Sequence, residues 1–137
     1  MAPSAEQAFA SAGKGNSVIG WKLDREQRRA LIDRVHARFK NLVADHVTLA
    51  ARASDDAPKP EETEGLIVGR ADDGRGVEAM IVSINGTTDR PDGGTYHITW
   101  SLADGRRAEE SNDLLADGRW TALDLPMPVL IHPARFP

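Results

Sequence analysis

The sequence predicts a single α+β domain, and three observations lead to this prediction. A chain of 137 residues is long enough for one domain with a buried core but not for two. Most segments that can form regular structure are short, contain many β-branched residues and end at Gly, Pro or Asp, which is typical of strands joined by turns. The segment after Asp24 has helical periodicity. We expect the domain to span residues 17–137, after a flexible lead-in over the small and polar residues 1–16.

The beginning of this domain is predicted to be a strand followed by a helix. Residues 17–23 alternate in part between apolar and polar side chains and contain several strand-forming types. Asp24 is a good N-cap residue, and Gln27 stands three positions later, where a capping box needs it. We therefore expect a helix from Asp24 to about Lys40, packed through one apolar stripe made of Leu31, Ile32, Val35 and Phe39.

The remaining two thirds of the chain predict strands with one further short helix. Strands are expected at 45–51, 65–70, 77–84 and 95–102. The second and third of these form a hairpin, while the acidic, proline-containing residues 54–64 are expected to be a surface loop. Ser111 or Asn112 is expected to cap a short helix. The tail, residues 122–133, predicts a short strand, a proline bend and a last strand at a sheet edge.

Composition excludes several classes of function. The formal net charge of −4 gives no general affinity for duplex nucleic acid or an anionic membrane, although one RNA end or a small phosphorylated ligand stays compatible with it. With no cysteine, the chain has no thiol nucleophile, disulfide or Cys-ligated zinc site. No stretch predicts a signal peptide or a membrane span. We expect a soluble, cytoplasmic protein, of an oligomeric state that the sequence does not determine.

One motif occurs twice, and each copy lies on a predicted strand. The first copy is His46-Val47-Thr48-Leu49, and the second is His97-Ile98-Thr99-Trp100. Alternate side chains of a strand point to opposite faces, so the histidine and the threonine of each copy share one face, about 7 Å apart, and the apolar residues share the other. Each strand is therefore expected to rest on the core through one face and to present an imidazole and a hydroxyl on the other.

Two such strands side by side would suit in-line displacement at phosphorus. Near neutral pH one imidazole can accept the proton of the attacking group while the other protonates the departing oxygen. The hydroxyls of Thr48 and Thr99 would hold the phosphate oxygens, and this division of roles needs neither a metal nor a cofactor. The catalytic candidates are therefore His46 and His97, with either one as acid or base.

This arrangement resembles the 2H phosphoesterase superfamily, which is defined by two His-x-Thr/Ser motifs. The residues that carry the resemblance are His46, Thr48, His97 and Thr99, with their apolar neighbours. The resemblance implies two lobes of antiparallel sheet related by a pseudo-two-fold axis around a central groove, with a helix on the first lobe. It also implies a metal-independent phosphodiesterase that hydrolyses a nucleotide or RNA cyclic phosphate, most simply a 2′,3′-cyclic one. The chain is shorter than most members, and its second lobe has no long helix.

Further substrate-binding candidates follow the second motif strand. They are Arg106, Arg107, Ser111 and Asn112, to which Trp120 is added as a possible flank of the groove. A charged turn followed by a capped helical turn explains the first four equally well.

Other functions remain open at the level of sequence. They are a non-catalytic phosphate- or nucleotide-binding module, a 2H enzyme that acts on cyclic oligonucleotide signals, and a metal-dependent hydrolase that uses the two histidines and the acidic loop. The last is disfavoured because a histidine and a threonine two positions apart are a poor zinc shell.

Overall fold

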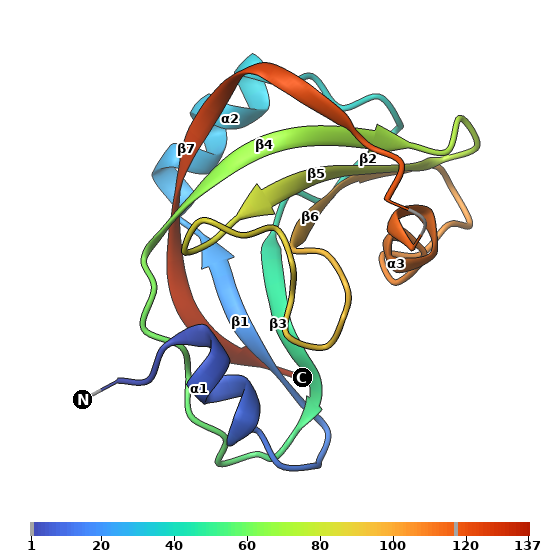
Figure 1. The fold of residues 1–137 in the computed structure, drawn as a ribbon. Helices are drawn as coiled ribbons and strands as arrows, with labels where there is room; N and C mark the ends of the chain where they lie inside the picture. The colour runs from blue at the N-terminus through green and yellow to red at the C-terminus, as the bar shows by residue number, and fades with distance from the viewer. Residues whose placement is uncertain (1, 117) are drawn as a thin grey trace.

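The computed structural model describes residues 2–116 and 118–137, and it confirms an α+β fold with an antiparallel sheet. Figure 1 shows the course of the chain. The elements are, in order, α1 (Ala5–Ala10), β1 (Ser17–Leu23), α2 (Arg25–Arg34), β2 (Asn41–Leu42), β3 (His46–Ala53), β4 (Glu64–Asp72), β5 (Val77–Ser83), β6 (His97–Leu102), α3 (Glu110–Leu115) and β7 (Thr121–Phe136).

Within the described residues, seven strands form one sheet in the order β2-β6-β5-β4-β7-β1-β3. The predicted hairpin is β4–β5, and both motif strands, β3 and β6, are present. The tail differs from its prediction, because β7 is one continuous strand inside the sheet. Its first part pairs with β4 and its last part with β1, so Pro128 and Pro133 fall where β7 has a partner on one side only. A proline there removes no ladder hydrogen bond, which explains why no bend is needed.

The sheet curls until the two motif strands, near its opposite ends, meet (Figure 1). The link between β2 and β3 forms the join, where the amides of Val43 and Ala44 donate to the carbonyl oxygens of Trp100 and Thr99 on β6. Arg28 of α2 donates to the carbonyl oxygens of Val43 and Ala44. The curl therefore brings together two strands that are about fifty positions apart in the chain.

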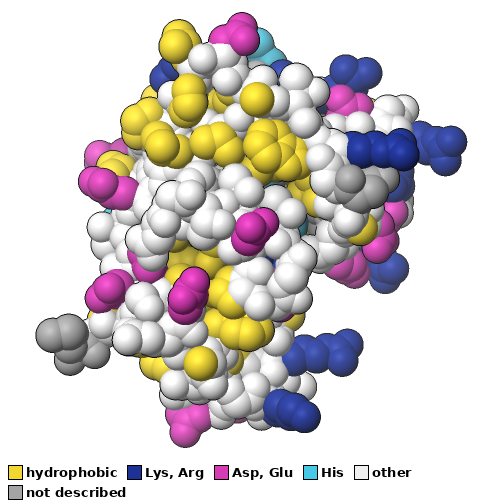
Figure 2. All heavy atoms as spheres, viewed as in Figure 1, with side chains coloured by type: hydrophobic (Ala, Val, Ile, Leu, Met, Phe, Trp, Pro, Cys, Tyr) yellow, Lys and Arg dark blue, Asp and Glu magenta, His cyan; other side chains and the backbone are white. Residues whose placement is uncertain are grey.

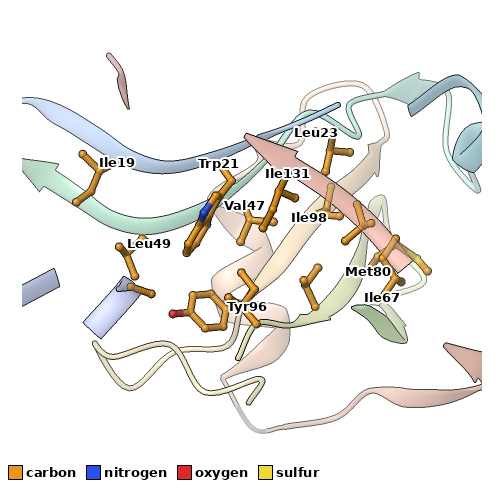
Figure 3. Packing of buried hydrophobic residues seen from close by; sticks show 14 of the residues in the cluster. Ile19, Trp21, Leu23, Val47, Leu49, Ile67, Met80, Tyr96, Ile98 and Ile131 are labelled. Carbon is orange, nitrogen blue, oxygen red and sulfur yellow. The ribbon is translucent and has the colours of Figure 1, made fainter. Parts of the chain in front are cut away.

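The core lies on the inner side of the curled sheet. Val47 and Leu49 of β3 and Ile98 and Trp100 of β6 are fully buried there, as the strand alternation predicts. Tyr96 packs edge to face against Trp21, with ring centroids 5.9 Å apart, and is a core residue. Figure 3 shows this packing, with side chains from β1, β3, β6 and β7 converging. The apolar half of each motif thus anchors its strand and directs the histidine and threonine outward.

Two helices differ from their predictions. Within residues 2–16, the expected flexible lead-in instead contains α1, which has a complete capping box between Ser4 and Gln7 and buries Ala5 and Ala8 in the core. Helix α2 ends at Arg34, six residues before the predicted end. The following residues bond to the sheet, since the amide of Arg38 donates to the buried carboxylate of Glu78.

The predicted capping box of α2 is incomplete. Asp24 accepts a hydrogen bond from the amide of Gln27, as expected for an N-cap. The side chain of Gln27, however, bonds to backbone groups of Pro128 and Leu130 on β7 and not to the Asp24 amide. Gln27 therefore ties the helix to β7.

Helix α3 covers the outer face of β4 and β5. A second apolar cluster joins Ala79 and Ile81 of β5 to Leu115 of α3, with Trp120 packed beside it. Farther along, Leu66, Leu125 and Leu130 are exposed, and Figure 2 shows hydrophobic side chains at the surface over β4 and β7. In the described ranges, no helix combines the length and apolar character needed to cross a membrane.

Candidate functional site

A pocket of about 390 Å³ lies where β3 and β6 meet, and all four motif residues line it: His46, Thr48, His97 and Thr99. The two strands supply it from their outer faces, opposite the core. The loop between β5 and β6 contributes Arg90 and Asp92, and α3 with its N-cap contributes Asn112 and Glu109. A volume of this size is within the range of small-ligand sites.

The ring of His97 is held in one tautomer. Its Nδ1 lies 2.8 Å from the carbonyl oxygen of Thr95, which can only accept, so Nδ1 carries the hydrogen and Nε2 is the basic atom of the neutral ring. Burial lowers the pKa of His97 from its ordinary 6.5, because desolvation disfavours the charged ring. The Thr95 hydrogen bond opposes this change, whereas the nearby charges of Arg90 and His46 add to it. His97 is therefore a neutral base at pH 7.

His46 has a different partner, the carboxylate of Asp45. Its Nδ1 lies 3.0 Å from Asp45 Oδ2, so the ring again presents Nε2 as its remaining nitrogen. Partial burial acts to raise the pKa of Asp45, but hydrogen bonds from Lys22 and His46 outweigh it and lower this pKa to about 2. The carboxylate thus stays ionised across the physiological range, with Lys22 at 2.6 Å and Arg25 at 3.0 Å as further partners.

The two ends of the pocket differ in character. Beside His46 the wall is apolar and consists of Val18, Ala51, Phe136 and Pro137. The ring of Phe136 lies edge to face against His46, with centroids 4.8 Å apart, and Lys22 Nζ is 4.6 Å from its centroid. Beside His97 the wall is polar and contains the Arg90–Asp92 ion pair, at 2.8 Å. A ligand with one aromatic and one anionic part fits this asymmetry.

The two threonines are not equivalent. Thr48 is half-buried, and its hydroxyl has no hydrogen-bond partner among the residues that the structure describes. Thr99 is almost fully buried, and its hydroxyl lies 2.9 Å from the Ser111 hydroxyl and 3.3 Å from the carbonyl oxygen of Ala108. The side chain of Ser111 is thus a support for Thr99 and not a ligand-binding group. Neither Ser111 nor Asn112 caps α3, whose N-cap is Glu109.

Besides Ser111, three predicted substrate-binding residues do not line the pocket. Arg106 is bound to Asp73, to Glu110 and to the carbonyl oxygen of Arg75. Arg107 is exposed and pairs with Glu109 at 3.5 Å. Trp120 packs against Gly69, where an added Cβ would stand 2.2 Å from the indole. Of the five additional candidates, Asn112 alone lines the pocket.

Sequence reasoning missed Asp45, Arg90 and Phe136. Asp45 directly precedes the first motif, and strand alternation would send it to the opposite face, but β3 begins only at His46. The presence of an acidic residue directly before the first motif was therefore the sequence signal that could have identified Asp45 as a site residue. Arg90 and Phe136 have no local pattern, since only the folded chain brings them to the motif strands.

No group of three or more His, Cys, Asp or Glu side chains suitable for a metal ion occurs in the part of the chain that the structure describes. Comparisons of the chain with protein-family models, with curated proteins and with solved structures found no match.

Proposed function

We propose that the protein is a metal-independent phosphodiesterase of the 2H type that opens a nucleotide or RNA cyclic phosphate, most simply a 2′,3′-cyclic one. The observation that carries the proposal is the convergence of both His-x-Thr motifs on one pocket. The motifs come from separate strands, and each strand turns its apolar residues to the core.

The hydrogen bonds of the two rings support a division of roles. His97 is the base, because its Nε2 carries a lone pair and burial keeps the ring neutral. His46 is the acid, because the Asp45 carboxylate offsets the positive charge that an imidazole acid carries. His97 removes a proton from water as its oxygen bonds to phosphorus. His46 donates a proton to the ribose oxygen as the P–O ester bond breaks, and the product is a phosphomonoester.

The shape of the sheet is consistent with two lobes. Strand β1 pairs with the end of β7 and β3 pairs with β1, while β4, β5, β6 and β2 follow one another on the side of its beginning. One motif strand belongs to each group, and Arg25 of helix α2 donates to Asp45 beside the first motif. A pseudo-two-fold relation between these groups is part of the proposal.

The test is hydrolysis of 2′,3′-cyclic nucleotides in EDTA, with the four bases compared. We expect turnover by the wild-type protein and its loss in both His46→Ala and His97→Ala, with nucleotide binding retained. His132→Ala is the matched control, since this exposed histidine pairs with Asp24 and does not line the pocket. Turnover that EDTA abolishes would contradict the metal-independent mechanism.

Binding without turnover by the wild-type protein would identify a nucleotide-binding module instead. One observation favours this second candidate, namely that the Thr99 hydroxyl is already engaged by Ser111 and Ala108.

A further inference from the structure

Arg90 is an almost buried cation at the polar end of the pocket. It lies in the loop between β5 and β6, and its side chain is 10% exposed. The loop is fixed by backbone hydrogen bonds between Arg90 and Gly94 and between Gly93 and Arg90. Asp92 adds a further bond to the Gly94 amide. The position of the guanidinium is therefore set before any ligand binds.

The partners of Arg90 use only part of the guanidinium. Nε donates to Asp92 at 2.8 Å, and Nη2 donates to Asn112 at 3.2 Å. Arginine has five N–H donors, and no described residue accepts from Nη1. A charged group with unused donors in a nearly buried place is well suited to bind an oxyanion.

The charge of Arg90 reaches the site where the proposed reaction occurs. Three other charged or titratable groups face His97 across the pocket: His46 from β3, Asp92 from the same loop as Arg90, and Glu109 from the turn before α3. The effect of Arg90 on the pKa of His97 is larger than the opposing effect of Asp92. The net effect of the Arg90–Asp92 pair on His97 is thus that of a positive charge.

We infer that Arg90 binds the non-bridging oxygens of the reacting phosphate, in the role that the sequence motif assigns to Thr99. This inference rests on the proposed function and names a further binding residue for it. Thr99 is engaged by Ser111 and Ala108, whereas Arg90 lines the same pocket and has donors beyond those that bond to Asp92 and Asn112. Thr48 serves the other side of the phosphate.

The experiment compares Arg90→Gln and Arg90→Lys with Arg29→Gln, which removes the same charge from an exposed position on α2. With 2′,3′-cyclic AMP as substrate, we expect Arg90→Gln to lower kcat/KM by about 10- to 100-fold, as for a lost charge-assisted hydrogen bond. Arg90→Lys keeps the positive charge but lacks the planar guanidinium, and we expect its kcat/KM to fall less than that of Arg90→Gln. Arg29→Gln should behave as the wild type.

A second readout separates phosphate binding from loop support. Removing the Arg90 cation should move the acid limb of the pH–rate profile to higher pH, since the protonated form of His97 is no longer opposed by this charge. Arg90→Lys should leave the limb in place. A folded Arg90→Gln protein with unchanged kinetics and an unmoved acid limb would overturn the inference. If Arg90→Gln does not fold, Arg90→Lys tests the inference instead. Wild-type kinetics in Arg90→Lys would show that the guanidinium makes no special contact with the phosphate, and would overturn the inference.

Binding distinguishes failure of this inference from failure of the proposed function. If the wild-type protein turns over no cyclic nucleotide, the phosphodiesterase proposal fails, and calorimetry with 2′-AMP still tests Arg90. Weaker binding in Arg90→Gln but not in Arg29→Gln supports the assignment. Equal affinity in both variants, or no binding of 2′-AMP by the wild type, overturns it.

Discussion

Asp45 and His46 are neighbours in the chain, and the Asp45 carboxylate accepts a hydrogen bond from Nδ1 of that imidazole at 3.0 Å. Neighbouring residues of a regular strand cannot meet in this way, because their side chains leave on opposite faces. The contact forms because the chain is irregular just before β3, where Ala44 has a φ of 42°. The irregular turn therefore supplies the first histidine with its orienting group.

Asp45→Ala should lower kcat/KM for a 2′,3′-cyclic nucleotide by roughly 10- to 100-fold, because a ring without its acceptor is poorly aligned for proton transfer. The loss should fall mainly on kcat. Asp104→Ala removes an exposed carboxylate that pairs with Lys40 and is the matched control. Equal kinetics in the two variants would contradict the positioning role.

Acid unfolding should also report on Asp45. Its folded pKa of about 2 lies below the ordinary 3.8, so its ion pairs stabilise the fold above about pH 4 and are lost as pH falls toward 2. We expect Asp45→Asn to lack about 1 kcal/mol of this pH-dependent stability, a figure reduced because the side chain is partly exposed. Urea unfolding of the wild type and of Asp45→Asn at pH 5 and pH 2.5 measures the difference. If both proteins lose the same free energy of unfolding between these two pH values, the prediction is refuted.

The pH profile of kcat/KM should be bell-shaped. On the acid side the rate rises as His97 loses its proton, and burial places this limb below pH 6.5. On the alkaline side the rate falls once the proposed acid no longer carries the proton that it must donate. The two apparent values belong to the coupled site as a whole, because the charge of His46 lowers the pKa of His97. A flat profile between pH 5 and 9 is incompatible with this mechanism.

Gly20→Ala should damage both the fold and the site. Gly20 of β1 lies opposite Thr48 of β3, and an added Cβ would stand 2.2 Å from the Val47 carbonyl oxygen and 3.1 Å from Thr48 Cα. The backbone of β3 would have to move, at a cost of about 1–3 kcal/mol in the free energy of unfolding. Thermal unfolding and kcat/KM at a temperature where the variant stays folded would test this. Wild-type values in both would show that the strands can adjust.

Arg106→Gln should destabilise the fold without changing kcat/KM. The side chain joins the β4–β5 turn to α3 through Asp73 and Glu110, and these bonds are only partly exposed. We expect a lower free energy of unfolding, because the hydrogen bonds to Asp73 and Glu110 are lost. A raised KM in a folded Arg106→Gln protein would show that Arg106 binds the substrate after all.

The sequence by itself determined the local structure and the chemistry of the motif strands. Alternation placed Val47 and Ile98 in the core and their histidine neighbours outside it, because successive side chains of a strand leave on opposite faces. The same local rules failed for β7 and for the end of α2. There the pairing of β7 with β4 and β1, and the bonds of Glu78 to the segment after α2, outweigh local preference.

Only the tertiary structure decided which residues share the pocket. Arg90 and Phe136 reach it because the sheet curls and joins β3 to β6, a contact between segments about fifty positions apart that no local pattern encodes. Residues that are close in sequence also differ in role, since Asn112 lines the pocket while Ser111 and Arg106 hold the structure around it. Side-chain periodicity fixes a face of an element, but the meeting of two faces depends on how the whole sheet closes around its core.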